Sequence, residues 1–229
     1  MAYIKSEIIK KINEDGVPLY KRYCVNYRGK TSDTSEKVTE VIAEYLLTNI
    51  PTYETVTRSD SYKVNEHKNP PGYDPKNPQS NRTEELFARS LWGEKLGNLE
   101  ILDYQIPLKN SNQDKGLGKI DLLAFDGENL VILELKCPTS GETLLRCVLE
   151  AYTYREIVDG RKLAKDFGRE GADVHTAVLI FKGKRSQPYK DWRNGNQPQI
   201  KELMKRLKVG LYTLDNETSK KIEETASYH

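Results

Sequence analysis

The sequence predicts an α/β fold in which a mixed β-sheet is flanked by helices. Three observations lead to this prediction. Short apolar segments bounded by turn residues recur along the chain, as β-strands require. Other segments carry apolar residues at helical spacing and lie between those strands. The strands first follow one another directly and then alternate with helices, which is typical of an antiparallel meander followed by crossover units.

The expected elements follow the chain in order. Before residue 66 the pattern predicts helices at 3–12 and 35–47 and strands near 20–27 and 53–64. Prolines and asparagines at 66–81 predict a loop or linker. From residue 82 onward we expect, in this order, a helix at 82–97, strands at 99–108, 118–125 and 130–136, a helix at 141–160, a strand at 175–182, a helix at 197–208 and a last strand at 209–215.

A T-x-x-E capping box is expected to open the long helix at 141–160, with Thr139 as the cap and Glu142 three residues later. Gly160 is expected to close that helix. The whole chain then divides into an N-terminal extension, residues 1–80, and an α/β core, residues 81–229.

The composition narrows the class of protein. The chain has 229 residues, 37% of them hydrophobic, which is enough for a sizeable core. No apolar run approaches membrane-spanning length, and the start MAYIKSEIIKK lacks the hydrophobic region of a signal peptide, so we expect no membrane partner. The cysteine pattern leads us to expect a reducing, cytoplasmic location. Three cysteines without a CxxC pair argue against disulfides and zinc knuckles. Three histidines without HExxH-like spacing argue against a zinc hydrolase.

Charge is unevenly distributed, although the formal net charge is only +2. Residues 121–160 hold three basic and eight acidic side chains, whereas residues 181–208 hold nine basic and two acidic ones. An acidic segment beside a basic one suits a site that binds both a cation and a polyanion. Two ordinary solvated surfaces would give the same counts.

The segment GKIDLLAFDGENLVILELK, residues 118–136, predicts a buried hairpin that carries charged residues. If DGEN at 126–129 forms the loop, Phe125 pairs with Leu130, and the two residue numbers of every antiparallel pair add up to 255. Asp121 then lies directly opposite Glu134. Lys136 follows Glu134 by two residues and therefore shares its face.

Two opposed carboxylates repel each other at neutral pH unless one of them takes up a proton or a cation lies between them. Oxygen ligands select a hard divalent ion such as Mg²⁺. Such an ion polarises phosphoryl oxygens and acidifies bound water. The alternative is a buried Lys–Glu ion pair, or a strand end that reaches solvent.

Asp121 followed by Glu134-Leu135-Lys136 resembles the D…ExK signature of the restriction-endonuclease-like PD-(D/E)xK nuclease superfamily. The superfamily has an αβββαβ core, and residues 82–182 are expected to follow that order. The resemblance implies a nuclease that hydrolyses phosphodiester bonds in DNA with Mg²⁺ or Mn²⁺. It further implies metal ligands at Asp121, Glu134, the Leu135 carbonyl and Glu84, with Lys136 assisting the attacking water.

The family often takes another acid from the first core helix, where this chain has both Glu84 and Glu85. Glu84 matches better, since Phe87 and Leu91 follow it at helical spacing. Some family members carry a Q-x-x-x-Y motif on the helix after ExK, where this chain has Glu150 and Tyr154.

Glu142, Arg146, Glu150 and Tyr154 form one i,i+4 line along this expected helix. The resemblance places Arg146 near phosphate and Glu150 near the site, whereas a row of surface salt pairs would give the same spacing. This chain has GKID, residues 118–121, where the family signature has proline followed by aspartate, and Gly118 is a candidate for the same tight approach.

In the basic segment, Lys184 and Arg185 are the residues expected to contact nucleic acid. Two alternatives to a nuclease remain: a non-catalytic nucleic-acid-binding module on a degenerate nuclease fold, and an unrelated α/β protein with a structural ion pair. The N-terminal extension is a candidate for recognition, for packing against the core or for forming a homodimer.

Overall fold

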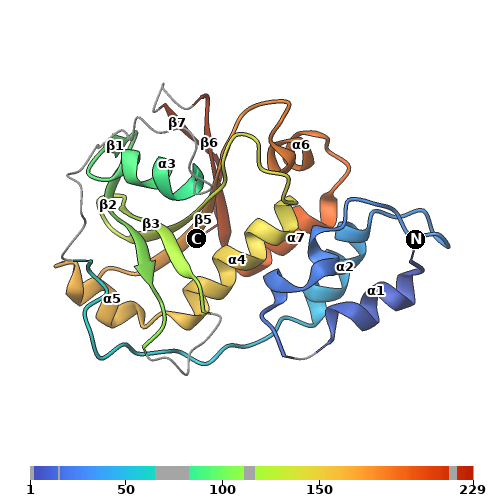
Figure 1. The fold of residues 1–229 in the computed structure, drawn as a ribbon, viewed down its shortest axis with the longest axis horizontal. Helices are drawn as coiled ribbons and strands as arrows, with labels where there is room; N and C mark the ends of the chain where they lie inside the picture. Colours follow the sequence, from blue (N-terminus) through green and yellow to red (C-terminus); the bar gives the residue numbers. More distant parts are fainter. Residues whose placement is uncertain (1–2, 15, 65–82, 111–116, 217–220, 229) are drawn as a thin grey trace.

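A mixed β-sheet forms the centre of the structure (Figure 1). The computed structural model describes residues 3–14, 16–64, 83–110, 117–216 and 221–228. Over these residues the sheet has seven strands that lie side by side in chain order: β1 (Lys95–Leu96), β2 (Leu99–Pro107), β3 (Lys119–Phe125), β4 (Leu130–Leu135), β5 (Val174–Phe181), β6 (Val209–Leu214) and β7 (Ile222–Ala226).

From β1 to β4 each strand is antiparallel to the next one. Strands β4, β5 and β6 are parallel to one another, and β7 is antiparallel to β6. The sheet is therefore mixed, as the sequence predicts. Each parallel step is made through helices, because a crossover has to return the chain to the same end of the sheet.

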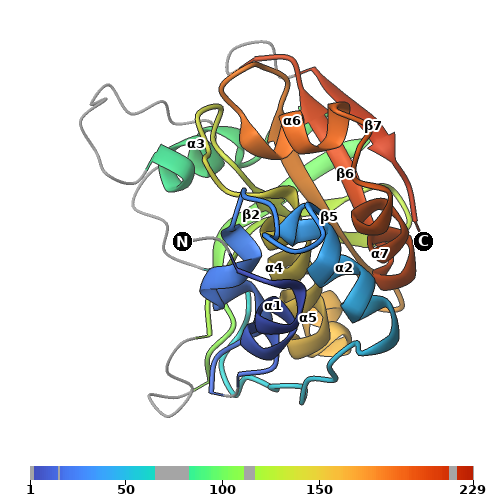
Figure 2. The ribbon, with the colours of Figure 1, turned by 90° about the vertical axis from the view of Figure 1, so that its right-hand side faces the viewer.

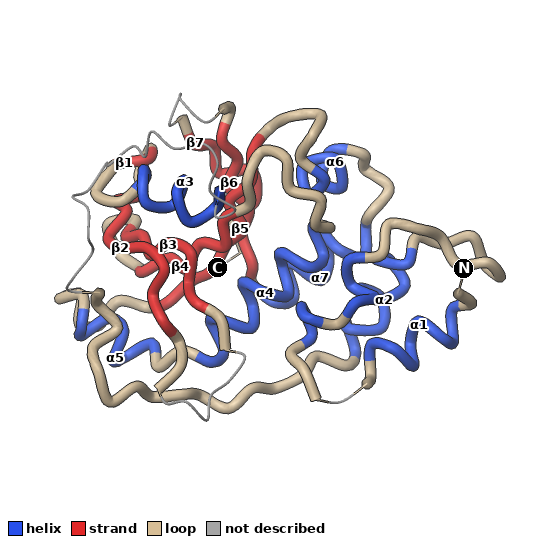
Figure 3. Tube along the Cα trace, viewed as in Figure 1, coloured by secondary structure: helices blue, strands red, loops and turns tan. Residues whose placement is uncertain are grey.

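The helices lie on both faces of this sheet (Figures 1 and 3). They are α1 (Lys5–Ile12), α2 (Val38–Thr48), α3 (Thr83–Leu91), α4 (Leu144–Ile157), α5 (Gly160–Asp166), α6 (Gln187–Arg193) and α7 (Pro198–Leu207), with 3₁₀ helices at Leu19–Lys21 and Tyr23–Asn26. Helix α3 packs on one face, and α4 and α7 pack on the other. Helices α1 and α2 form a further layer outside α4 and α7 (Figure 2).

Alternation along the strands produces two separate apolar clusters. On β4, Leu130 and Ile132 belong to the cluster beneath α4, whereas Val131, Leu133 and Leu135 belong to the cluster beneath α3. This is the period of two that a strand imposes when both of its faces are covered. Residue 134 follows Ile132 by two positions, so the same alternation places it on the face that α4 covers.

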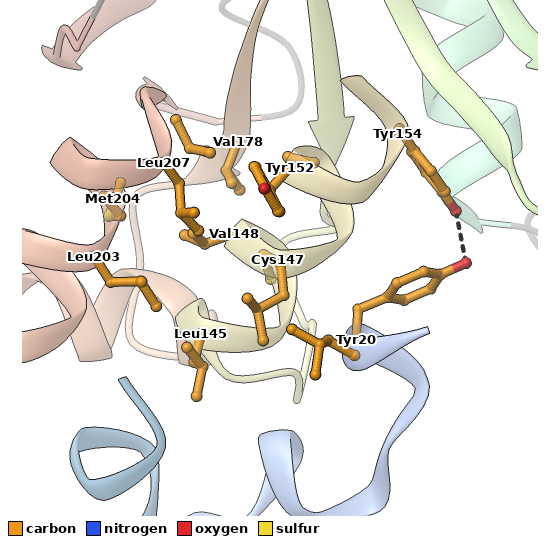
Figure 4. Packing of buried hydrophobic residues seen from close by; sticks show 14 of the residues in the cluster. Tyr20, Leu145, Cys147, Val148, Tyr152, Tyr154, Val178, Leu203, Met204 and Leu207 are labelled. Carbon is orange, nitrogen blue, oxygen red and sulfur yellow. Dashed lines mark hydrogen bonds between the residues drawn. The ribbon is translucent and has the colours of Figure 1, made fainter. Parts of the chain in front are cut away.

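Helix α4 is buried on almost every side, because the sheet lies along one flank and the N-terminal segment along the other (Figure 4). It begins after Thr143, whose hydroxyl oxygen accepts a hydrogen bond from the Arg146 amide at 3.3 Å. The expected capping box of Thr139 and Glu142 is therefore wrong. Residues 136–143 form a connection, here called the β4–α4 loop.

The β4–α4 loop is held by distant parts of the chain. The Asn26 side chain accepts the Thr143 amide hydrogen at 2.8 Å, and the Thr143 hydroxyl donates to the Val25 carbonyl at 2.6 Å. From the other side, the Gln187 amide donates to the Ser140 carbonyl at 2.9 Å. The N-terminal segment and the start of α6 therefore both fix this loop.

Several expected elements differ in the structure. Residues 20–27 form 3₁₀ turns rather than a strand, because the apolar run packs on α4 and short apolar runs do not distinguish the two states. Residues 53–64 contribute only an isolated bridge from Val56 to Val158. The helix expected at 82–97 ends at Leu91, and Gly160 begins α5 instead of ending α4.

Helix α6, the short strand β1 and the last strand β7 have no counterpart among the expected elements. The loop expected at 66–81 lies outside the described residues. None of the helices described here has both the length and the apolar character needed to cross a bilayer.

Asp191 joins α6 to the start of α4, which gives a test of this packing. Its buried carboxylate accepts the Leu144 amide at 3.0 Å and the side-chain amides of Gln187 and Gln197 at 2.8 and 3.2 Å. Replacing Asp191 with alanine leaves three donors without an acceptor, so we expect the free energy of unfolding to fall by about 1–3 kcal/mol. Urea denaturation measures this change.

Asp191→Asn is the matched control, because it retains one carbonyl oxygen for the Leu144 amide. We expect it to lose less stability than Asp191→Ala. Equal midpoints for Asp191→Ala and the unsubstituted protein would contradict a stabilising role for this connection.

Candidate active site

The Lys136 ammonium lies among carboxylates at the end of β4. It is 2.5 Å from Glu134 Oε1, 3.1 Å from Glu142 Oε2, 3.4 Å from Glu150 Oε2 and 3.9 Å from Glu84 Oε2. Lys136 is only 4% exposed and Glu134 only 2% exposed, so this is a charged cluster inside the protein. Strands β3 and β4, helices α3 and α4 and the β4–α4 loop all contribute to its surroundings.

The hairpin register agrees with the prediction. In each observed pair, from Leu122 opposite Leu133 to Phe125 opposite Leu130, the two residue numbers add up to 255. Asp121 precedes this ladder, and its Oδ2 accepts the Leu135 backbone amide at 3.0 Å. The Asp121 carboxylate is therefore fixed to the last residue of β4, beside Glu134.

Gln105 holds the other oxygen of Asp121. Its side-chain amide donates to Asp121 Oδ1 at 3.0 Å. Gln105 has a backbone φ of 53°, a left-handed conformation that is uncommon for a residue other than glycine. Such outliers are costly and cluster at functional sites, which makes Gln105 a candidate for positioning Asp121.

The structure distinguishes between the two acids in the first turn of α3. Glu84 Oε1 accepts the Cys137 backbone amide at 3.1 Å, and its other oxygen faces Lys136. Glu85 instead lies 3.6 Å from Arg89 in an i,i+4 pair. Glu84 therefore belongs to the charged cluster and Glu85 does not.

Helix α4 supplies Glu150 and Tyr154 to the same cluster. The Tyr154 hydroxyl donates to Glu150 Oε1 at 2.8 Å, while Glu150 Oε2 faces Lys136. Tyr20 of the N-terminal segment lies behind this pair, with 3.5 Å between the two tyrosine hydroxyls and the rings edge to face (Figure 4). A hydrogen-bonded row therefore runs from the N-terminal segment to Lys136.

Arg146 is farther from the centre of the cluster. Its Nε is 3.1 Å from Glu142 Oε1, so one carboxylate of the β4–α4 loop lies between two cations. Lys184 and Arg185 are exposed on the β5–α6 connection and are not part of the cluster. That connection nevertheless adjoins the site, because it leads directly into Gln187, which binds the β4–α4 loop.

Burial and crowding raise the pKa values of the central acids. The pKa of Asp121 is raised to about 7, mainly by burial; the charge of Lys136 opposes this rise, and the charges of Glu150 and Glu84 add to it. Burial, with the charges of Asp121 and Glu150, raises the pKa of Glu134 well above its ordinary value. Burial alone would lower the pKa of Lys136, but the surrounding acids outweigh it and raise this pKa well above its ordinary value.

Glu134 Oε2 is buried and has neither a hydrogen-bond nor an ion-pair partner among the residues that the structure describes. Glu142 Oε2 and Arg146 Nε also lack a hydrogen bond there, but each of them forms an ion pair. Buried carboxylate oxygens are normally hydrogen-bonded or bound to a cation. In the part of the chain that the structure describes, no three His, Cys, Asp or Glu side chains converge as a ready metal cage. The Lys136 ammonium instead lies among the carboxylates.

The donor set nevertheless fits a hard divalent cation. Five carboxylates face the two cationic side chains of Lys136 and Arg146, so the fully ionised cluster has an excess of negative charge. All of the candidate ligands are oxygens, which suits Mg²⁺ or Mn²⁺. The unpartnered oxygen of Glu134 and the neighbouring Asp121 carboxylate are the first candidates to bind it.

Three parts of the site were not assigned to it from the sequence. The sequence predicts a helix-capping role for Glu142, a strand at Tyr20 and an ordinary strand position for Gln105. Gln105 could have been placed opposite Asp121 from the register of β2 and β3. Tyr20 carries no local signal, because it is 134 residues away from Tyr154 in sequence.

No family model, curated protein or solved structure matches this chain.

The raised pKa of Asp121 predicts how stability depends on pH. In the unfolded chain an aspartate titrates near about 4, whereas in the folded protein the pKa of Asp121 is about 7. The folded state therefore binds more protons between these two values, and the free energy of unfolding falls as pH rises through this window. Above about pH 7 this contribution is fully lost.

Asp121→Asn cannot ionise, so we expect a shallower decline of stability over the same window. Urea denaturation at a series of pH values, without divalent metal, measures the difference. A residual decline is expected from Glu134. Identical pH profiles for the two proteins would show that Asp121 does not titrate as described.

Gly118 makes room for Tyr154, which gives a second test. A Cβ at position 118 would lie 2.0 Å from the Tyr154 hydroxyl oxygen and 2.7 Å from Cζ, far inside contact distance. Gly118→Ala should therefore displace Tyr154 from Glu150 and lower the free energy of unfolding by about 1–3 kcal/mol. Thermal or urea denaturation measures the loss.

Gly29→Ala is the control, since a Cβ there would lie 3.6 Å from the nearest atom, an ordinary contact distance. If both alanine variants change stability equally, the loss at 118 does not come from crowding of Tyr154.

Proposed function

We propose that this protein is a metal-dependent nuclease that hydrolyses phosphodiester bonds in DNA. The observation that carries the proposal is the buried, unpartnered oxygen of Glu134 beside the Asp121 carboxylate, with the Lys136 ammonium 2.5 Å from the other Glu134 oxygen. Buried carboxylate oxygens are usually hydrogen-bonded or bound to a cation, so an unpartnered one next to a second carboxylate supports a cation site.

The proposed roles follow from the contacts. Asp121 and Glu134 would hold the cation, assisted by Glu84 and, as the superfamily resemblance implies, by the Leu135 carbonyl. The cation would polarise a phosphoryl oxygen and lower the pKa of a water molecule. Gln105 and the Leu135 amide keep the Asp121 carboxylate oriented.

Lys136 remains protonated, because the acids around it raise its pKa. We assign it to orienting the attacking water and to stabilising the negative charge that grows on the phosphoryl group. Glu150 Oε2 lies 3.4 Å from the Lys136 ammonium, and the Tyr154 hydroxyl orients Glu150 by donating a hydrogen bond to its other oxygen. These two residues therefore position the lysine rather than contact the reacting phosphate.

The order of elements supports the same proposal. From α3 through β2, β3, β4 and α4 to β5, the chain makes an antiparallel meander and then a parallel crossover. This is the αβββαβ order that the restriction-endonuclease-like resemblance implies. We therefore include membership of that superfamily in the proposal.

The test combines cleavage with metal binding. A plasmid and a single-stranded DNA are incubated with Mg²⁺, with Mn²⁺ and with chelator. We expect cleavage that requires metal, and a loss of about a hundredfold or more in rate for Lys136→Met, since the charge acts mainly in the transition state. Metal should also raise the melting temperature, and Asp121→Asn should remove that increase.

Lys136→Met retains much of the packing of the lysine stem, so a loss of cleavage at unchanged DNA affinity would identify the charge as the cause. A structural ion pair would instead give no cleavage in any protein and a marked fall in melting temperature for the variant. A binding module would hold DNA without cutting it. Cleavage by Lys136→Met at the unsubstituted rate would refute the role of the lysine.

A further inference from the structure

A cationic cavity lies beside the candidate active site, between the end of β5 and α6. It has a volume of about 520 Å³ and is lined by Lys182, Gly183, Lys184, Tyr189, Lys190, Arg193 and Asn194. Four of the lining side chains are cationic and none is acidic. In contrast, a cavity of about 900 Å³ beside α5, lined by residues that include Val158 and Val174, mixes two basic with three acidic side chains.

One of the four cations is already neutralised. The Lys182 ammonium lies 2.8 Å from Asp215 and 2.5 Å from Glu223, so it ties β7 to the end of β5. Lys184, Lys190 and Arg193 are exposed on the rim, and Arg193 lies over the Tyr189 ring. Three cationic groups are thus available to a ligand.

Hydrogen bonds from α6, which lines this cavity, hold it against the β4–α4 loop and the start of α4. Gln187, at the start of α6, donates its backbone amide to Ser140 of the β4–α4 loop. Asp191, in the middle of α6, caps the first residue of α4. The element that carries Lys190 and Arg193 is therefore fixed against the same loop that carries Glu142 toward Lys136.

We propose that this cavity is a second phosphate-binding subsite, which holds another backbone phosphate of the DNA strand that is cleaved at Lys136. The proposal rests on the proposed function and adds a binding site to it. The cavity is positively charged and suits a phosphate directly, whereas the acidic charged cluster would face a phosphate through the cation it is proposed to hold. The subsite contributes affinity and register, and the charged cluster contributes chemistry.

The experiment measures DNA binding without cleavage. Lys190→Ala with Arg193→Ala is made in the Asp121→Asn protein, and its affinity for a fluorescent duplex and a fluorescent single strand is measured over a range of salt. We expect the dissociation constant to rise about tenfold or more, and the slope of log affinity against log salt to fall by about two. Lys184→Ala, outside any helix, should lower the slope by about one.

The matched control removes the same charges elsewhere. Arg161→Ala with Lys165→Ala takes one arginine and one lysine from α5, which has seven residues like α6 and lies far from it in Figure 1. Both pairs are exposed on short helices. We expect this control to weaken binding much less, and melting temperatures of both variants show that each is folded.

The outcomes separate the two proposals. If the cavity variant and the α5 variant weaken binding equally, the cavity is ordinary charged surface and the inference is overturned. If the cavity variant alone weakens binding while the unsubstituted protein cleaves no DNA with any metal, the subsite stands and the nuclease proposal fails. An unchanged salt slope for both the cavity variant and Lys184→Ala would also overturn the subsite.

Discussion

The burial of one ammonium group among carboxylates is the constraint on which the arrangement of this protein depends. Removing a charge from water is tolerated only when opposite charges and hydrogen bonds replace the water. Lys136 meets this requirement through acids from β4, α3, α4 and the β4–α4 loop. Because these elements come from distant parts of the chain, the cluster fixes their relative positions. The sheet, the two helices and the loop form one frame around it.

Much of the central hairpin could be predicted from the sequence, because its signals are local. A four-residue loop and the two-residue period of a strand are enough to place Asp121 beside Glu134 and to place Lys136 on the same face. The side chains on β4 that face the other way, Val131, Leu133 and Leu135, also lie where the alternation predicts. Strand register alone is therefore enough to predict that Asp121, Glu134 and Lys136 lie close together.

The rest of the site depends on contacts that no local pattern encodes. Glu142 fits a capping box by spacing, but the helix begins at Thr143's hydroxyl because Val25 and Asn26 bind the loop there. Gln105 has a left-handed backbone, which glutamine does not favour, and its side chain bonds to Asp121; neither feature is signalled by its residue type. Tyr20 lies in an apolar run that is compatible with a strand, and only packing against α4 makes it helical. These are tertiary effects that override local preference.

The order of strands in the sheet has a consequence for how the chain folds. Since every strand pairs with its neighbour in sequence, the sheet can form progressively from β1 to β7 by closing moderate loops. Such local topologies favour fast folding, whereas contacts between distant residues have a larger loop-closure cost. The bonds from Tyr20, Val25 and Asn26 to α4 and its preceding loop span more than a hundred residues. We therefore expect the sheet to form first and the charged cluster to reach its final geometry late, when the N-terminal segment docks on α4.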